Sequence, residues 1–309
     1  EDAYVTGQIL LERKYAAMSD PRILIVKLSA IGDCLHATPV AEAIKRTFPG
    51  AHLGWAVHPH CAAVVKGNPY VDRVHLWPRR GWLKQLPALR QELMAERYDT
   101  ALDLQGLLKS AMVGVVSGAK LRVGPSENRE HSAALYHRKS PAHPDLPIVG
   151  QMLARAQSIG ATPEPWPPMR MTVTEGDREA VSALMAAHGL DANLPIIALN
   201  PSAGKPFKQW PPERFAAIGH FLQSSGHQPL VTGGPGDQAL DDAIQASAPS
   251  PIVSLVGKTS LTQLGAFFER CRLFLGGDTG PMHMAQAVGC PVLALFGPTR
   301  AEVLGPRGP

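Results

Sequence analysis

The sequence predicts an α/β protein built as two successive, mostly parallel sheets. Short apolar runs typical of buried strands alternate with longer amphipathic stretches typical of helices. Strands separated by helices need right-handed crossovers, which make a sheet mostly parallel. The proline cluster at 162–168 interrupts this alternation near the middle of the 309 residues, and it is the expected linker between two domains of ordinary size.

The first domain is expected over residues 22–162, after an extension at 1–20 that can form a helix. The continuous apolar run 22–28 suits a strand buried on both faces. A glycine turn at 29–39 and a helix at 40–47 are expected to follow. The other elements expected here are strands at 52–57, 73–77, 100–104 and 120–123, helices at 83–97, 107–116 and 147–160, and an irregular basic stretch at 125–139.

The second domain is expected over residues 169–309 and repeats the alternation. It ends with a strand, a tight polar turn, a short helix and a second strand at 272–299. The elements expected before that unit are strands at 169–173, 195–200, 228–232 and 252–256, and helices at 176–188, 213–224, 237–248 and 261–270.

Composition excludes several classes of protein. With 45% hydrophobic residues and a mean hydropathy of −0.05, the chain can bury a sizeable core. It shows no membrane-spanning run and no signal-peptide pattern, so a soluble, cytoplasmic protein is expected. The four scattered cysteines lack CxxC spacing, and no metal site is expected. A net charge of +4 favours acidic small molecules or an anionic membrane surface over nucleic acid.

The turn at 278–281 is the first candidate site. Asp278 and Thr279 are helix-capping residue types, Gly280 lets a ligand approach the backbone, and Pro281 suits the start of a helix. Free N–H groups and the helix dipole at such an end favour a phosphate or diphosphate. The alternative is an ordinary capped helix.

Asp33 is the second candidate, because it follows the first strand at the edge where open α/β sheets bind ligands. Its alternative is a helix cap. His36 lies one helical turn later and can orient Asp33 or a substrate hydroxyl; the alternative is a packed or solvated histidine.

Two further loops follow buried strands in the second domain. Ser202, Lys205 and Lys208 lie in a loop of small and basic residues that can wrap phosphates, although it is not a Walker loop. Asp237 ends a glycine-rich turn and can accept ribose hydroxyls. The alternative for the lysine loop is a solvated connection, and a glycine cluster alone is weak evidence.

Four motifs together resemble the ADP-heptose:lipopolysaccharide heptosyltransferases of glycosyltransferase family 9. They are KLSAIGDCLHATP at 27–39, KQWP at 208–211, GDTGPMH at 277–283 and FGPT at 296–299. The first motif, and the third and fourth taken together, are specific to that family, whereas the loop at 208–211 is less so. The resemblance covers nearly the whole span from residue 22 to residue 299.

The resemblance implies a GT-B fold, in which two Rossmann-like domains with parallel sheets face each other across a cleft. The first would bind the acceptor and the second ADP-heptose, for an inverting transfer to the lipopolysaccharide inner core without metal or cofactor. Asp33 would be the general base and Lys208 would hold the diphosphate. Asp278, Thr279, Gly280 and His283 would line the donor site.

An anionic, phosphorylated and carboxylate-rich acceptor would suit the basic residues of the first domain. It also suggests peripheral attachment to the inner face of the cytoplasmic membrane. The acceptor contacts expected from these residues are His36, Arg129 and Arg138, with Arg79, Arg80, Lys84 and Lys139 as further candidates against a solvated surface.

Two features depart from the family's pattern. Members usually continue past the FGPT turn with a C-terminal helix that crosses back to the first domain. Here the sequence stops at Pro309, so either that segment is missing or residues 1–20 make the contact. Where some members have adjacent threonines, this chain has Ser202-Ala-Gly204. The other readings are a GT-B transferase of another sugar, a sugar-nucleotide 2-epimerase, and a non-catalytic nucleotide-sugar binder.

Overall fold

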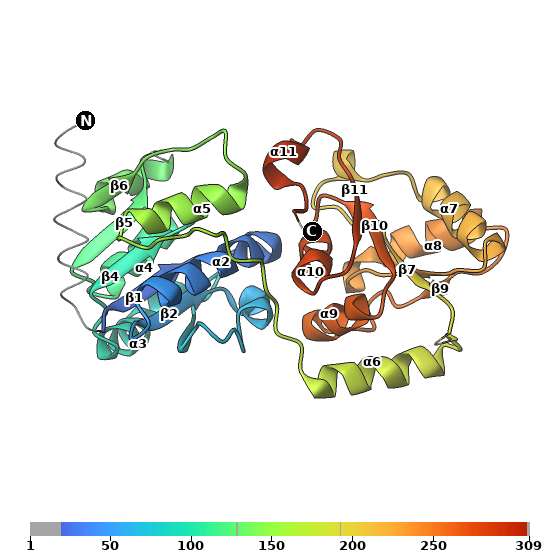
Figure 1. The fold of residues 1–309 in the computed structure, drawn as a ribbon, viewed down its shortest axis with the longest axis horizontal. Helices are drawn as coiled ribbons and strands as arrows, with labels where there is room; N and C mark the ends of the chain where they lie inside the picture. Colours follow the sequence, from blue (N-terminus) through green and yellow to red (C-terminus); the bar gives the residue numbers. More distant parts are fainter. Residues whose placement is uncertain (1–19, 128, 192, 308–309) are drawn as a thin grey trace. The chain divides into compact units, whose positions relative to one another are not determined.

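The computed structural model describes residues 20–127, 129–191 and 193–307. Nearly all of the extension expected at 1–20 therefore lies outside the described residues. The chain divides into two compact units, Glu1–Arg170 and Met171–Pro309, which we call unit 1 and unit 2. Each unit is a parallel sheet with helices on both faces (Figure 1).

Unit 1 contains a six-stranded sheet in the order β3-β2-β1-β4-β5-β6. All of its strand pairs are parallel. The chain runs outward from β1 to β3 and then returns to the other side of β1, which makes a topological switch point between β1 and β4. The strands are β1 (Arg22–Val26), β2 (His52–Val57), β3 (Arg73–Leu76), β4 (Thr100–Asp103), β5 (Leu121–Pro125) and β6 (Arg138–Ser140).

The helices of unit 1 form two layers around this sheet (Figure 1). They are α2 (Ile31–Thr47), α3 (Trp82–Ala95), α4 (Leu108–Val116) and α5 (Ile148–Gln157), with the 3-10 helices η1 (Pro59–Val64) and η2 (Arg129–Leu135). Helices α2 and α5 pack together, and α3 packs beside α4. The buried cluster between the strands and α3 includes Val26, Trp77 and Leu93.

Unit 2 repeats the winding of unit 1 with five strands in the order β11-β10-β7-β8-β9. The chain starts at the central strand β7, runs out to β9 and returns on the other side at β10, so the switch point lies between β7 and β10. The strands are β7 (Ile196–Asn200), β8 (Gln228–Val231), β9 (Val253–Ser254), β10 (Leu273–Gly277) and β11 (Val292–Leu295).

Helices again cover both faces of this second sheet (Figure 1). Helices α7 and α8 pack together, and α9 packs against both α6 and α10. The helices are α6 (Glu175–Ala187), α7 (Pro212–Ser224), α8 (Gln238–Ser247), α9 (Leu261–Glu269), α10 (Gly280–Ala287) and α11 (Ala301–Leu304), with the 3-10 helices η3 (Pro206–Lys208) and η4 (Pro235–Asp237).

The start of α2 corrects the prediction of a turn at 29–39. The helix begins at Ile31 and continues through Pro39. Proline has no N–H to donate to the carbonyl of Leu35, which normally weakens a helix interior. Here the Thr38 hydroxyl donates to that carbonyl at 2.7 Å, so the acceptor that Pro39 leaves open is satisfied. Asp33 therefore lies in the first turn of a helix.

Three strand predictions were also inaccurate. Residues 169–173 form no strand, and only Val253–Ser254 pairs within the predicted 252–256. The basic stretch predicted as irregular contains β6, which pairs with β5 at the sheet edge. Edge strands tolerate charged residues, so β6 lacks the apolar pattern by which a strand is recognised.

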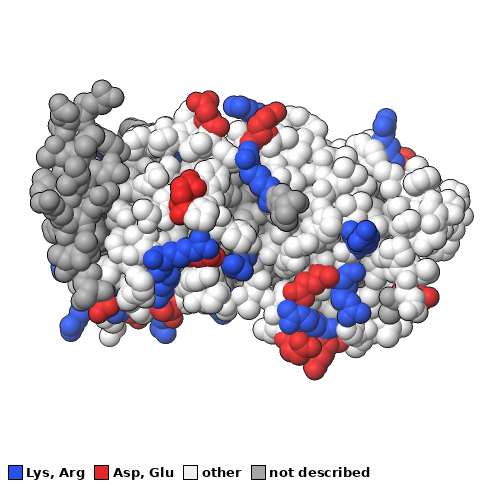
Figure 2. Space-filling model, viewed as in Figure 1, with Lys and Arg blue, Asp and Glu red and all other residues white. Residues whose placement is uncertain are grey.

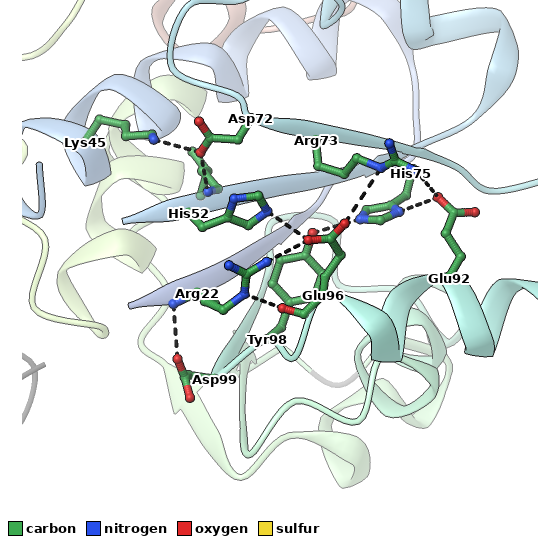
Figure 3. A network of polar contacts seen from close by, with 11 residues as sticks. Arg22, Lys45, His52, Asp72, Arg73, His75, Glu92, Glu96, Tyr98 and Asp99 are labelled. Carbon is green, nitrogen blue, oxygen red and sulfur yellow. Dashed lines mark hydrogen bonds and ion pairs between the residues drawn. The ribbon is translucent and has the colours of Figure 1, made fainter. Parts of the chain in front are cut away.

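A polar network holds the C-terminal end of α3 against unit 1's sheet (Figure 3). Glu96 contacts Arg22 at 2.6 Å and His52 at 3.1 Å. Glu92 contacts Nδ1 of His75 at 2.6 Å, while Nε2 of the same buried ring lies 2.8 Å from the Tyr98 hydroxyl. Both glutamates of α3 are thus paired with basic groups on the strands.

The linker after unit 1's last helix is fixed to α2. Thr162 pairs with Thr47, and Arg170 forms a 3.0 Å ion pair with the buried carboxylate of Glu42. The Arg170 N–H also donates to Thr38. The next residue, Met171, is buried in unit 2 beside Gly265 of α9. The chain therefore passes from one unit to the other within a single peptide step.

Candidate functional site

A cavity of about 250 Å³ opens at the switch point of unit 1. The loop after β1 contributes Lys27 and Ser29, the first turn of α2 contributes Asp33, and the loop after β4 contributes residues 104–107. Open α/β sheets bind ligands at this position because the loops after adjacent strands diverge there. The remaining lining comes from residues around η2 and from α5, namely Pro125, Glu127, Arg129, Ile148, Gln151, Met152 and Arg155.

Asp33 combines a capping contact with an open position on the cavity. Its Oδ2 accepts the Ala30 N–H at 3.1 Å and lies 4.0 Å from Nζ of Lys27. The side chain is 43% exposed. Within the described residues no group contacts Oδ1, so one carboxylate oxygen holds the helix start while the other can accept a proton or a hydrogen bond.

Lys27 and Arg155 bring two positive charges to the cavity that Asp33 lines. Lys27 is 6% exposed and lies 3.5 Å from the Leu104 carbonyl, to which Nη1 of Arg155 also donates at 3.1 Å. Burial lowers the pKa of Arg155 below its ordinary value, and neighbouring acidic groups partly offset that effect. Arg155 was missed as a site residue, because its position depends on how α5 packs.

Asp103 anchors the loop after β4 beneath this cavity. It is fully buried and accepts from two backbone N–H groups, of Gln105 at 2.7 Å and Gly106 at 3.0 Å. The hydroxyls of Ser110 and Tyr136 also donate to it, each at 2.7 Å. The Asp103 carboxylate therefore fixes the loop that forms one wall of the cavity. Its four hydrogen bonds give Asp103 a structural role and leave the chemistry to other groups.

The three acceptor contacts predicted in this unit take different places. Arg129 lines the cavity, as expected of a substrate contact. His36 is buried in α2, and Arg138 donates to the Ser158 carbonyl at 2.9 Å; neither lines the cavity. Of the three, only Arg129 lines the same cavity as Asp33.

Lys208 and Asp278 meet at the switch point of unit 2. Lys208 follows β7 and Asp278 follows β10, and their Nζ and Oδ2 atoms form a 3.0 Å ion pair. Nε2 of the buried His283 lies 3.8 Å from the other carboxylate oxygen. Residues 70 positions apart in the sequence are thus adjacent because β7 and β10 are neighbours.

Helix α10 begins beside this ion pair without a side-chain cap. Thr279 is the N-cap residue, but its hydroxyl donates back to the Gly277 carbonyl at 3.3 Å. Asp278 pairs with Lys208 rather than with the first turn of the helix. The start of α10 therefore has no side-chain cap, and the backbone N–H groups of Gly280 and Met282 remain suited to an anion.

Ser202 and Asp237 connect the loops after β7 and β8. The Ser202 hydroxyl donates to Oδ2 of Asp237 at 2.6 Å, and the Gly234 N–H donates to the same oxygen at 2.7 Å. Oδ1 is the atom left for a ribose hydroxyl. Lys205 is exposed at the start of η3 and has no side-chain partner within the described ranges.

Charge is dispersed on the face drawn in Figure 2, where Lys and Arg side chains are interspersed with Asp and Glu. The three stretches that the structure describes contain no group of three His, Cys, Asp or Glu side chains placed to hold a metal ion. None of the helices in those stretches is both long and apolar enough to cross a bilayer.

Two doubly wound units in tandem, each with its polar loops at a switch point, define the GT-B class of glycosyltransferases. The model of glycosyltransferase family 9 (heptosyltransferase) matches residues 86–309, so the chain belongs to this family.

Known proteins similar to the chain agree with this assignment. Lipopolysaccharide heptosyltransferase 3 of Escherichia coli K12 is 26% identical over 279 residues, which cover 87% of this chain and 80% of that protein. The crystal structure of the family 9 glycosyl transferase of Veillonella parvula has a TM-score of 0.85 at 22% identity, covering 93% and 83%. The structure of E. coli ADP-heptose lps heptosyltransferase II has a TM-score of 0.79 at 23% sequence identity, and the match covers 92% of this chain and 87% of that one.

Proposed function

We propose that this chain is an inverting glycosyltransferase that moves heptose from ADP-heptose to the inner core of lipopolysaccharide. The observation that carries the proposal is the pair of switch-point sites in a family 9 chain, an aspartate in a cationic cavity in unit 1 and a lysine beside an uncapped helix in unit 2. The substrates follow the names of its relatives, a lipopolysaccharide heptosyltransferase and an ADP-heptose lps heptosyltransferase.

Asp33 is the proposed general base. In an inverting transfer one group removes the proton of the acceptor hydroxyl while the nucleotide leaves from the opposite face of the sugar. Oδ1 of Asp33 has no partner among the described residues and belongs to a carboxylate that lines the cavity. Nζ of Lys27 lies 4.0 Å from Oδ2, so a positive charge stays beside the Asp33 carboxylate until that carboxylate takes up the proton.

The predicted domain at 169–309, of which all but the first two residues belong to unit 2, is the proposed donor domain. Negative charge grows on the departing ADP, and fixed positive groups stabilise it more in the transition state than in the ground state. Lys208 and the first N–H groups of α10 would supply that stabilisation. Thr279, Gly280 and His283 would complete the diphosphate and sugar contacts, with Ser202, Lys205 and Asp237 on the phosphate and ribose side.

The predicted domain at 22–162, which lies within unit 1, is the proposed acceptor domain. Lys27, Arg129 and Arg155 outnumber the acidic groups Asp33 and Glu127 around its cavity. Guanidinium groups suit carboxylates and phosphates, which fits an anionic glycolipid. Because such an acceptor is lipid-linked, the enzyme is proposed to act at the inner face of the cytoplasmic membrane as a peripheral protein.

The test is release of ADP from ADP-heptose with and without a truncated lipopolysaccharide core, followed by mass spectrometry of the acceptor. The expected result is acceptor-dependent ADP release and a gain of one heptose. Turnover of ADP-heptose alone would show an epimerase or hydrolase, and binding without transfer to any core acceptor would show a binding protein. Transfer from another nucleotide sugar would overturn the donor assignment.

A further inference from the structure

Two groups of basic residues in unit 1 have different surroundings. Lys27, Arg129 and Arg155 line the cavity, whereas Arg79, Arg80 and Lys84 are exposed and do not line it. Arg79 and Arg80 lie in the turn between β3 and α3, and Lys84 lies in the first turn of α3. We propose that this turn and the outer side of α3 form a docking surface for an anionic lipid bilayer.

The sequence of this surface is basic without acidic neighbours. Residues 76–91 read LWPRRGWLKQLPALRQ and contain four basic residues and no aspartate or glutamate, although acidic residues are nearly as common as basic ones in the whole chain. The four basic residues, Arg79, Arg80, Lys84 and Arg90, are all exposed. Clusters of this kind attract anionic headgroups.

Helix α3 has one face packed against the core and one exposed face, as an interfacial helix has. Trp82, Leu86, Leu89 and Leu93 recur at helical spacing and face the core of unit 1. A second stripe at the same spacing, Leu83, Pro87, Arg90 and Met94, is exposed. Within it Leu83 is 66% exposed and Met94 44% exposed. An outward face that mixes apolar and basic side chains suits a bilayer interface better than bulk water.

The acidic residues of α3 do not oppose this assignment. Glu92 and Glu96 come after the basic stretch, and both are held by groups on the strands, namely Arg22, His52, Arg73 and His75 (Figure 3). Arg22 and Arg73 therefore place positive charge beside these two carboxylates within unit 1. The exposed charge on the first two turns of α3 is positive.

Aromatic packing stiffens the turn that carries the basic residues. Trp77 is buried, and its ring lies 5.5 Å from that of Trp82. Lys109 also donates to the Arg79 carbonyl at 3.0 Å, which ties the turn to α4. Leu83 is therefore presented on a rigid support, so little conformational entropy is lost when it enters a bilayer.

The surface adjoins the proposed acceptor cavity. Lys109, which binds the turn, lies two residues after Leu107 of the cavity wall, and Leu108 between them is 43% exposed. This part of the inference rests on the proposed function. A lipid-linked acceptor whose sugar enters the cavity would leave its acyl chains in the membrane on which α3 lies.

The test is binding of the full chain to phosphatidylcholine vesicles with and without phosphatidylglycerol, measured by flotation at several salt concentrations. We expect binding that needs phosphatidylglycerol and weakens with salt. Lys84→Glu and Arg90→Glu should each weaken binding about fivefold or more, and Leu83→Ser about tenfold. Matched controls in unit 2, Arg272→Glu for charge and Phe221→Ser for an apolar residue that is 65% exposed, should leave binding unchanged.

Failure of this surface and failure of the proposed function give different results. With a water-soluble acceptor that lacks acyl chains, Leu83→Ser should release ADP at the wild-type rate. Turnover of that acceptor without any binding to anionic vesicles would overturn the docking surface and leave the function standing. Vesicle binding that Leu83→Ser and Phe221→Ser weaken equally would also overturn it. Specific vesicle binding without transfer would overturn the function alone.

Discussion

At the scale of single residues, Lys208 and Asp278 hold each other at 3.0 Å and are mostly shielded from solvent. Replacing Lys208 with methionine keeps the length of the side chain but removes the charge that would meet the departing diphosphate. We expect kcat/KM to fall roughly 100- to 1,000-fold. Lys120→Met is the matched control, because that lysine is 83% exposed, pairs with Asp99 in unit 1 and lies outside both candidate sites. Steady-state ADP release measures both, and equal losses would refute the assignment.

A buried histidine should make unit 1 sensitive to acid. Nδ1 of His58 lies 2.6 Å from the Trp77 carbonyl, so this nitrogen carries the proton, and Nε2 accepts from Nζ of Lys109 at 3.2 Å. Burial lowers the pKa of His58 from its ordinary 6.5, and the charge of Lys109 adds to that effect. A base with a lowered folded pKa stabilises the fold above pH 6.5 and loses this contribution as the pH falls.

The free energy of unfolding should therefore drop as the pH falls from 7.5 to 5.5, with a contribution from His58 of at most about 1.4 kcal/mol, because pH 5.5 lies one unit below the ordinary pKa of 6.5. The drop should be smaller in His58→Gln than in the wild type. His75 should leave part of the drop in the variant, because burial lowers its pKa too. Urea unfolding at the two pH values measures the difference, and identical drops would contradict it.

At the scale of secondary-structure elements, β2 depends on a glycine that no side chain can replace. A Cβ on Gly54 would lie 1.8 Å from the Tyr98 hydroxyl, which is also hydrogen-bonded to His75. Gly54→Ala must therefore displace the ring, and we expect a loss of about 1–3 kcal/mol. Gly176→Ala in α6 is the control, since the nearest atom would be 3.9 Å away. Thermal unfolding of the two variants should separate them, and equal midpoints would show that Tyr98 moves freely.

The elements were more predictable than the contacts between them. Apolar runs in the sequence predict the central strands because β1 and β7 are buried on both faces. The edge strand β6 is basic and has no such run, so the sequence does not predict it. The start of α2 was predicted too late, because a proline such as Pro39 normally interrupts a helix. Here the Thr38 hydroxyl donates to the carbonyl that the proline leaves without a donor. The candidate loops could be named from the sequence.

The pairings within the candidate site required the strand order. The contact of Lys208 with Asp278 follows from β7 and β10 being neighbours, which no local pattern encodes. The place of Arg155 in the cavity depends in the same way on how α5 packs against α2. A single sequence carries no signal for such long-range packing.

At the scale of the whole molecule, the two units are joined at a short, well-defined point. Arg170 is held by Glu42, which is 3% exposed as a side chain and also pairs with Arg46. Glu42→Gln removes the charge that fixes Arg170, so trypsin should cut after Arg170 several-fold faster. Glu269→Gln is the control, because it frees Arg178 within unit 2 instead. Limited proteolysis followed by mass spectrometry measures the rates, and an unchanged rate at Arg170 would show that Glu42 does not hold the linker.

The most direct test of the account is the Asp33→Asn variant, in which the amide oxygen can still accept the Ala30 N–H that starts α2. If Asp33 is the general base, transfer of heptose should fall roughly 100- to 10,000-fold, while ADP-heptose binds unit 2 with unchanged affinity. The two quantities are measured by ADP release and by calorimetric titration of the donor. Transfer at the wild-type rate would show that Asp33 serves only as a helix cap, and this result would contradict the proposed mechanism.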